Sequence, residues 1–543
     1  MKEAKKTNIN DNEDPSCGCH QPSVINYFEM KHISYVLATL ALAGCSSQEG
    51  SERLQLKKLP DADKPLNVVF ILSDDHRYDY MGFTGKVPWL KTPNMDRMAS
   101  EGVYIKNAFV TTSLSSPSRA SILTGLYSHT HKVVDNSAPL PEGLTFFPEY
   151  LQEAGYTTGF FGKWHMGNDS GDPQPGFNHW EAFRGQGDYY NPRINTNGEW
   201  IQYQDSAYVT DILTEHAIGF IRDQVKSNSP FFVYLSHKGV HGNFYPARRH
   251  MGFYKGQEPV VPENFNYPYY GASQLPTVNK VTGKAAHGKE YYGENMHPDW
   301  VRHQRESWHG VDYAYHGRNW RQEVISYCET LMSVDESIGS VLDCLKEEGI
   351  DENTMVIYMG DNGFAWGEHG LIDKRQFYEE SVRVPMLARC PGLFGGGQVL
   401  EKMVQNIDIG PTVLACAGLD KADNMVGSSF IPLLQGKDIP WRDRIFYEYY
   451  WEHEYPSTPT MHGVRTDRYK YIRYYGIWDT NEFYDLEADP GETRNLIDSP
   501  ELQDTIKSLN HELYDWLEST DGMYIPLKRT ERPHIDHRNM GNY

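Results

Sequence analysis

The chain has 543 residues, of which 39% are hydrophobic, 23% charged and 13% aromatic, a composition that excludes a disordered, collagen-like or coiled-coil protein and permits a sizeable core. With 51 Lys and Arg against 73 Asp and Glu, its formal charge is −22. An acidic chain is a poor general binder of nucleic acid or anionic membranes, and if its substrate is an anion, the binding site must contain a local cluster of positively charged side chains. The seven cysteines are too few and scattered for a disulfide framework or a Cys-based zinc site, and we expect four of them to be small core residues: Cys328, Cys344, Cys390 and Cys416.

Residues 1–45 predict a leader that contains a lipoprotein signal peptide. Basic residues follow Met30, where we expect translation to start, and an apolar run over residues 33–42 is too short for the ~20 residues of a membrane helix. The run ends in Leu-Ala-Gly-Cys, which resembles a bacterial lipobox and implies cleavage and lipidation at Cys45. The alternative is a buried helix with a chance cysteine. We therefore expect an exported protein that is lipid-anchored in the bacterial outer membrane, at the cell surface or in the periplasm, with residues 46–65 as a polar linker.

Residues 66–436 predict one large α/β domain. A continuous apolar run over residues 66–73 is typical of a buried parallel strand. Further strand-like runs cover residues 157–161, 231–236 and 354–359, and helical patterns cover residues 93–101, 146–154, 211–224 and 323–347. This alternation predicts a mainly parallel sheet sandwiched by helices. Residues 251–320 interrupt it with little periodicity and predict an insertion of long loops.

Residues 437–543 predict a smaller α+β subdomain. Residues 462–475 alternate like an antiparallel strand pair, and residues 482–486 add a short strand. A helix with one apolar stripe follows; its stripe residues are Leu502, Ile506, Leu509, Leu513 and Leu517.

Two polar islands follow two of the predicted strands directly. Asp74 and Asp75 come after the first strand, and Asp361 and Asn362 come after the strand over residues 354–359. Because ligands of open α/β sheets bind beyond the carboxyl ends of the strands, these side chains can converge on one cation. All-oxygen ligands suit Ca²⁺ or Mg²⁺ rather than zinc. Taken alone, such pairs are more often helix caps or turn residues.

A third island, residues 115–125 (SSPSRASILTG), carries a far more specific pattern. It resembles the signature of the type I sulfatases, in which Cys or Ser, any residue and Pro-Ser-Arg precede Leu-Thr-Gly. The stretches 162–167, 236–242 and 373–375 resemble further segments of that family in order and approximate spacing. The resemblance runs from about residue 66 to about residue 500. It implies an alkaline-phosphatase-like α/β fold, with a large mixed, mainly parallel sheet and a smaller C-terminal subdomain.

The resemblance also implies the chemistry. A plain serine would form a sulfate ester about as inert as the substrate, and the family avoids this by oxidising the residue to formylglycine (3-oxoalanine). Here that residue is Ser115, which implies a partner maturation enzyme of the type that accepts serine. One Ca²⁺ ion would be the cofactor, bound by Asp74, Asp75, Asp361, Asn362 and the modified Ser115.

Further residues take roles from the same resemblance. Arg119 would hold the aldehyde hydrate, Lys163 would bridge it to the sulfate, and His165 would take its proton as sulfate leaves. His241 and Lys374 would contact the ester oxygen, with His241 as the general acid. The alternative for each histidine is a purely structural role, because an isolated histidine is more often a buried imidazole whose hydrogen bonds are satisfied. The alternative for Arg119 is a structural ion pair on a helix surface.

The stretches 373–381, 385–392 and 482–496 resemble bacterial carbohydrate sulfatases, among them N-acetylglucosamine-6-sulfatases and enzymes active on ulvan. We expect the substrate partner to be a sulfated polysaccharide or oligosaccharide of algal, glycosaminoglycan or mucin origin. We also expect the enzyme to be a monomer that binds no nucleic acid and contacts the membrane only through its lipid anchor. Candidate substrate contacts are His237, Arg77, Arg248, Arg249, Trp366, His369, Arg375 and His462.

Two other classes stay open from the sequence. A metal phosphatase or phosphodiesterase of the same superfamily would need extra His and Asp ligands and would leave the Ser-x-Pro-Ser-Arg pattern without a purpose. A non-catalytic glycan-binding lipoprotein would result if Ser115 were never oxidised.

Overall fold

A computed structural model describes residues 56–59, 65–167, 170–265, 298, 300–301, 304, 320–452, 455–475 and 480–526. The expected leader, the lipidation site Cys45, most of the linker and most of the 251–320 insertion lie outside these residues. The described residues belong to one compact unit, which spans Arg53–Tyr543. None of its described helices is long and apolar enough to cross a bilayer.

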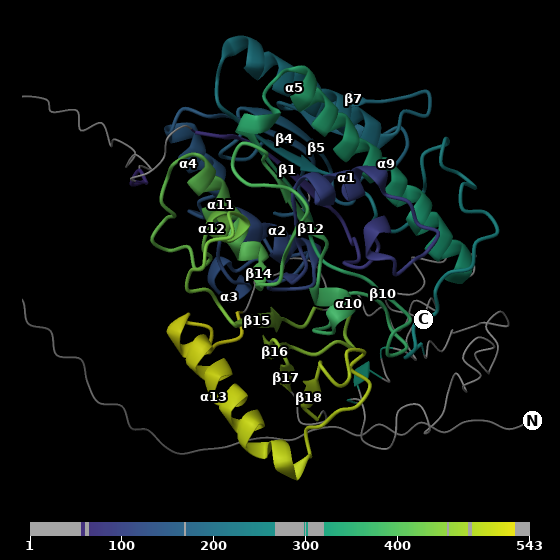
Figure 1. The fold of residues 1–543 in the computed structure, drawn as a ribbon, viewed down its shortest axis with the longest axis vertical. Coiled ribbons are helices and arrows are strands. Elements are labelled where there is room, and N and C mark those ends of the chain that lie inside the picture. Colours follow the sequence, from purple (N-terminus) through teal and green to yellow (C-terminus); the bar gives the residue numbers. More distant parts are fainter. Residues whose placement is uncertain are drawn as a thin grey trace, which may run out of the picture. The chain divides into compact units, whose positions relative to one another are not determined.

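A ten-stranded mixed sheet organises the unit (Figure 1). Its strand order is β13-β2-β12-β9-β1-β8-β4-β5-β6-β7. In that order, the strands cover Gln398–Leu400, Val103–Ile105, Met386–Arg389, Thr354–Gly360, Asn67–Ser73, Phe231–Ser236, Thr157–Lys163, His179–Phe183, Arg193–Thr196 and Glu199–Gln202. The central strands β9, β1, β8, β4 and β5 are parallel, while β12, β6 and β7 pair antiparallel with their neighbours. The predicted α/β fold with a mainly parallel sheet is confirmed.

Helices cover both faces of this sheet. The side chains of β1 alternate between the two layers, because successive residues of a strand point to opposite faces. Val68, Phe70 and Leu72 join the core beneath α2 (Ser115–Thr124), α4 (Phe147–Glu153) and α11 (Ile409–Cys416). Val69 and Ile71 join the core beneath α1 (Pro93–Glu101), α5 (Val209–Ser227) and α9 (Trp320–Glu347), and the two helical layers lie on opposite sides of the sheet in Figure 1.

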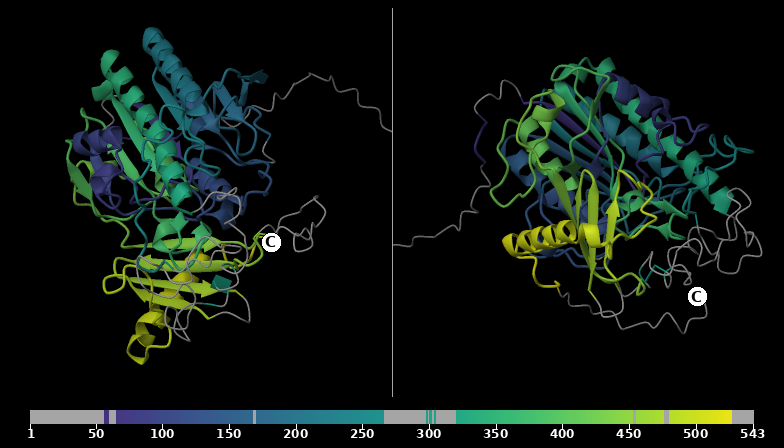
Figure 2. Two further views of the ribbon diagram at one scale, coloured as in Figure 1. Left: turned by 90° about the vertical axis from the view of Figure 1, so that its right-hand side faces the viewer. Right: turned by 60° about the horizontal axis from the view of Figure 1, so that its bottom comes forward.

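Four antiparallel strands form the C-terminal sheet: β15 (Arg444–Tyr449), β16 (Met461–Thr466), β17 (Tyr469–Tyr474) and β18 (Glu482–Asp485). Helix α13 (Gln503–Ser519) packs on it, as both views of Figure 2 show. Ile506, Leu509, Leu513 and Leu517 from its predicted stripe are buried with Val464, Tyr471 and Phe483 of the sheet. Leu502 precedes the helix as its N-cap. The four cysteines expected in the core are all buried and free.

Two strands run further than predicted, and both differences matter for the site. β4 extends to Lys163 and β9 extends to Gly360, because each strand keeps its parallel partner to the end of the sheet. The polar residues that follow therefore begin at the very edge of the sheet. Residues 251–265, the described start of the insertion, contain turns and neither a helix nor a strand.

Candidate functional site

Oxygen-bearing side chains meet at the carboxyl ends of β1 and β9. These strands pair in parallel register, so Asp74 and Asp75 leave the sheet beside Asp361 and Asn362. The backbone N–H of Asp75 donates to Oδ1 of Asp361 at 3.0 Å, and Nδ2 of Asn362 donates to Oδ1 of Asp75 at 2.7 Å. All four residues are fully buried. The structure thus brings together the four oxygen ligands named from the sequence.

Two oxygens of this group lack a hydrogen-bond partner among the described residues: Oδ2 of Asp75 and Oδ1 of Asn362. Buried polar atoms are rarely left unsatisfied, so each such atom needs an explanation. Burial and the neighbouring charges of Asp74 and Asp361 raise the pKa of Asp75 to about 7, despite the opposing charge of Lys374. A cation would satisfy both oxygens and neutralise the crowded carboxylates.

The first turn of α2 supplies Ser115 and Arg119, which lie on one helix face because they are four residues apart. The Ser115 hydroxyl donates to Oδ1 of Asp74 at 3.2 Å. Arg119 donates from Nε and Nη2 to Oδ2 of Asp361 at 3.0 and 2.9 Å, and its Nη1 donates to the Lys163 carbonyl at 2.7 Å and to Oγ of Ser236 at 2.6 Å. The guanidinium is buried, so Arg119 does not form the ion pair on an exposed helix surface that was the alternative to a role in the site.

Two buried lysines place positive charge against the same carboxylates. Lys163, at the end of β4, pairs with Oδ2 of Asp74, and Lys374, directly after β11 (Ile372–Asp373), pairs with Oδ1 of Asp75. Burial alone would raise the pKa of Asp74, but the charge of Lys163, with His241, Arg119 and Lys374, holds it well below its usual range. The cluster therefore pairs its carboxylates with two cationic side chains that could attract an anionic group.

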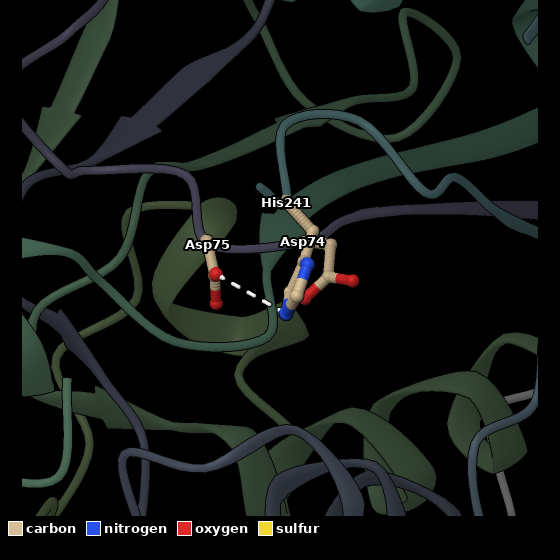
Figure 3. A group of neighbouring side chains, drawn as sticks. All are labelled: Asp74, Asp75 and His241. Carbon is tan, nitrogen blue, oxygen red and sulfur yellow. Dashed lines mark ion pairs between the residues drawn. The ribbon is translucent and has the colours of Figure 1, made fainter. Parts of the chain in front are cut away.

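His241 points its ring at the carboxylates (Figure 3). Its Nε2 lies 3.7 Å from Oδ2 of Asp75, and its Nδ1 lies 2.6 Å from the Gly242 carbonyl. A carbonyl only accepts, so Nδ1 carries the proton and Nε2 faces the cluster. The side chain keeps 12% exposure. Burial and the charge of Lys374 lower its pKa well below the usual value.

His165 lies beside the start of α2. Its Nδ1 is 3.3 Å from Oγ of Ser116, its Nε2 is 2.9 Å from Nε2 of Gln186, and Ser116 also donates to its carbonyl. Burial, reinforced by the charge of Lys163, lowers its pKa well below the usual value. The Gln186 amide nitrogen only donates, so in the neutral ring Nε2 of His165 accepts and Nδ1, which faces Ser116, carries the proton.

Several residues named as sugar contacts lie away from the cluster. The ring of His237 turns toward α9, where Nε2 lies 3.0 Å from Oγ of Ser337, and burial lowers its pKa to about 3. Arg249 pairs with Asp211 of α5 and Glu336 of α9, with 44% of its side chain exposed, and Arg248 donates to Ser206. Their actual partners are groups of the surrounding helices and loops.

The other named sugar contacts are buried in networks of their own. Arg77 pairs with Asp79 and Glu368, and Arg375 pairs with Asp373 and Glu452. His369 stacks on Tyr378 at 3.9 Å, and His462 lies 3.2 Å from the Tyr450 hydroxyl. Trp366 is completely buried in an aromatic cluster with Phe244.

Sequence reasoning missed a second layer around the histidines. Lys238 is buried, donates to the Gln186 carbonyl at 3.0 Å and lies 4.8 Å from the centre of the Tyr189 ring; burial lowers its pKa to about 8. The Tyr189 hydroxyl donates to the His241 carbonyl at 2.7 Å. The signal for Lys238 was its position between two motif histidines, whereas Gln186 and Tyr189 have no local pattern.

Known proteins share the sequence pattern and the fold of this chain. Residues 66–419 match the family model described as Sulfatase, and residues 367–519 match the model described as N-sulphoglucosamine sulphohydrolase, C-terminal. The N-acetylglucosamine-6-O-sulfatase of Bacteroides thetaiotaomicron is 33% identical over 527 residues, with 90% of each chain covered. The ulvan-active sulfatase of Formosa agariphila is 27% identical, over 84% of this chain and 83% of its own. A solved structure in complex with D-glucosamine-2-N,6-O-disulfate, described as its substrate, shares 30% identity at a TM-score of 0.72, covering 86% of this chain and 100% of that chain.

Proposed function

The chain belongs to the sulfatase family and is a sulfuric ester hydrolase, and from this premise we propose that it releases sulfate from sulfated sugars with a formylglycine formed from Ser115 and one Ca²⁺ ion. The observation that carries the proposal is the position of Ser115. Its hydroxyl donates to Asp74 inside a buried cluster of carboxylates, flanked by three cationic side chains.

The residues present fit a hard cation. Asp74, Asp75, Asp361 and Asn362 offer only oxygen, and the unsatisfied oxygens of Asp75 and Asn362 belong to this set. His241 completes a possible ligand group with Asp74 and Asp75 by distance, but an imidazole is a poor ligand for Ca²⁺. When bound, Ca²⁺ would polarise the sulfate oxygens, and the aldehyde hydrate at position 115 would supply a nucleophile that can later expel sulfate.

The chain's own residues then divide the remaining work. Lys163 and Lys374 offer positive charge to the anionic ester, which develops more charge on its leaving oxygen as the S–O bond breaks. Arg119 fixes Asp361 and the end of β4, which keeps Lys163 in position. His165, which contacts the neighbouring Ser116, would act as the base for the hydrate at residue 115 when its ring holds the proton on Nε2 and leaves Nδ1 free to accept. His241 gives a proton from Nε2 to the leaving alkoxide, once the bound anion has raised the pKa of its imidazole.

For the substrate we propose a sulfated oligosaccharide, with N-acetylglucosamine 6-sulfate as one alternative and an algal polysaccharide such as ulvan as the other. The named relatives that act on these sugars support this proposal. Export and lipidation at Cys45 would place the enzyme where polysaccharides are degraded.

The test is to produce the full chain with a serine-type maturation enzyme and to incubate it with a panel of sulfated mono- and oligosaccharides. We expect the peptide that contains residue 115 to be lighter by two hydrogens than the same peptide with unmodified serine. We also expect sulfate release from at least one sulfated aminosugar or ulvan fragment. Ser115→Ala is the matched control. Sulfate release by the Ser115→Ala variant at the rate of the unaltered chain would contradict the proposal.

The lipid anchor has its own test. In a bacterial host, Cys45→Ser should move the protein from the membrane fraction to the soluble exported fraction without changing the mass of the peptide that contains residue 115. An unchanged membrane fraction would show that Cys45 is not the anchor.

A further inference from the structure

A second buried group of ligand-type side chains lies outside the cluster at the ends of β1 and β9. His369 comes from the segment between β10 (Ala365–Trp366) and β11, Glu380 from α10 (Glu379–Val382), and Glu492 from the loop after β18. One ligand atom from each residue lies within 4.8 Å of those of the other two, and all three residues are buried. One stretch of the chain, residues 369–380, and the distant loop after β18 thus present one imidazole and two carboxylates to one point.

Glu380 is the unexplained member of this group. It is 7% exposed, and its Oε2 has no hydrogen-bond partner in the described part of the chain. The charges nearest to it include two carboxylates, Glu368 and Glu492, and one cation, Arg77. Arg77 is already shared between Asp79 and Glu368. A buried carboxylate in such surroundings needs a cation or a proton.

Glu492 keeps capacity for a further ligand. Its Oε1 lies 2.6 Å from Nζ of Lys470, and its Oε2 accepts from the Glu379 N–H at 2.8 Å. Each carboxylate oxygen has two lone pairs, so one stays available on each. Lys470 also pairs with Glu379 at 2.8 Å, which divides its charge between two carboxylates. The ring of His369 is fixed by its stacking on Tyr378.

We propose that His369, Glu380 and Glu492 form a second metal site, which takes a divalent transition-metal ion of the zinc type. Imidazole nitrogen and carboxylate oxygen are ligands that Zn²⁺ uses, whereas the all-oxygen set at Asp74 and Asp361 suits Ca²⁺. The ion would tie the segment that carries Lys374 to the loop after β18, and it would have a structural role. The site does not depend on the proposed reaction.

Zinc binding by the full-length, untagged chain tests the proposal. The protein is stripped with chelator, given excess Ca²⁺ and titrated with Zn²⁺ against a chromophoric zinc chelator, with bound metal counted after gel filtration. We expect one equivalent of zinc and a higher melting temperature, because an ion that binds only the folded state stabilises it. Glu380→Gln and His369→Gln should weaken zinc binding by more than about tenfold.

Two control variants keep the outcomes distinct. Glu482→Gln changes another buried glutamate of this region, one held by the hydroxyls of Tyr378, Tyr474 and Tyr484, and should keep the zinc. His241→Ala removes the histidine of the first cluster and should also keep it. The proposal is overturned if the unaltered chain binds no zinc in the presence of Ca²⁺. It is also overturned if His241→Ala loses the zinc and Glu380→Gln keeps it, because that is the result expected if Glu380 holds a proton and the zinc binds at the first cluster. If Glu380→Gln and His369→Gln do not fold, the comparison is between the unaltered chain and His241→Ala. One equivalent of bound zinc in both proteins supports the site, and no bound zinc in either protein overturns it.

Discussion

The Asp361 carboxylate serves two neighbours at once, since one oxygen accepts from the Asp75 backbone and the other accepts twice from Arg119. Asp361→Ala would remove an anionic ligand and leave a buried guanidinium unpaired, which costs roughly 3–5 kcal/mol. Asp361→Asn keeps the shape and an acceptor for Arg119, so it separates binding from folding.

We expect Asp361→Asn to fold, to lose most of its Ca²⁺ affinity and to lose turnover. Calcium titration by calorimetry and circular dichroism of the same samples check this. Near-normal rates in the presence of chelator would contradict the assignment of this residue as a metal ligand.

If His241 is the general acid, as proposed, its contribution should depend on the leaving group. A sugar alkoxide is strongly basic and needs a proton, whereas an activated phenolate hardly does, and general acid catalysis is worth about 10² to 10⁴ in rate. His241→Ala should therefore lose about that much kcat/KM on a sulfated sugar and far less on an activated aryl sulfate.

Lys374→Ala is the matched comparison for His241→Ala, because Lys374 contributes charge without a proton to transfer at neutral pH. We expect its losses on the two substrates to be similar. Equal losses for His241→Ala would make His241 a positioning residue. The acid would then be sought at Lys238, since the ring of His237 turns away toward α9.

At the scale of elements, the central strands β1, β4, β8 and β9 and the helices α1, α5, α9 and α13 were predictable because each has its own pattern. The apolar run of β1 and the stripe of α13 depend on nearest neighbours and appear in the sequence. The directions of His237 and Arg249 depend on helices α5 and α9 that pack against them, and no local pattern encodes this. For the same reason, the motifs identified Ser115 and Lys163, whereas the supporting contacts of Gln186 and Tyr189 emerged only in three dimensions.

A buried ion pair joins α3 (Ser128–His131) to the C-terminal sheet. Nδ1 of His129 lies 2.7 Å from Oε2 of Glu448 in β15. Burial would raise the pKa of Glu448 from 4.5, but the charge of His129 outweighs it and lowers the pKa to about 2. Burial would lower the pKa of His129, but Glu448 outweighs it and raises the value above 6.5. The stabilisation from Glu448 is present above pH 4.5 and lost toward pH 2, and that from His129 is present below pH 6.5 and lost as pH rises through its raised pKa.

We therefore expect the gap in melting temperature between the unaltered chain and His129→Gln to be largest at about pH 5 to 6 and to shrink at alkaline pH. Melting curves of both proteins across this range measure it. A gap that does not change with pH would mean that the histidine acts by packing alone.

The interface between α13 and the C-terminal sheet is formed by apolar side chains. Leu513 is fully buried there with Val464 and Tyr471, so Leu513→Ala should cost about 2–5 kcal/mol in the free energy of unfolding. Denaturant titration measures the loss, and Glu518→Ala on the exposed side of α13 is the control. A loss below about 1 kcal/mol would contradict this packing.

At the scale of the whole molecule, the proposed function makes activity depend on a modification of Ser115, whereas we expect folding not to need it. In a host that lacks a serine-type maturation enzyme we expect a folded protein with a normal melting temperature and no sulfatase activity. Mass analysis of residue 115 together with an activity assay checks this. Strong activity from chains with plain serine at that position would rule out the formylglycine mechanism.

The complete burial of Ser115 has a consequence for the protein's biogenesis. Its hydroxyl donates to Asp74, and every other residue of α2 is buried as well. If Ser115 is oxidised as proposed, the maturation enzyme would have to bind the chain around it, and a buried helix offers no extended segment to bind, so we expect the oxidation to be finished before the domain folds. The order of the two events would then decide the outcome, because we expect a chain that folds with plain serine at residue 115 to stay inactive unless it is unfolded again.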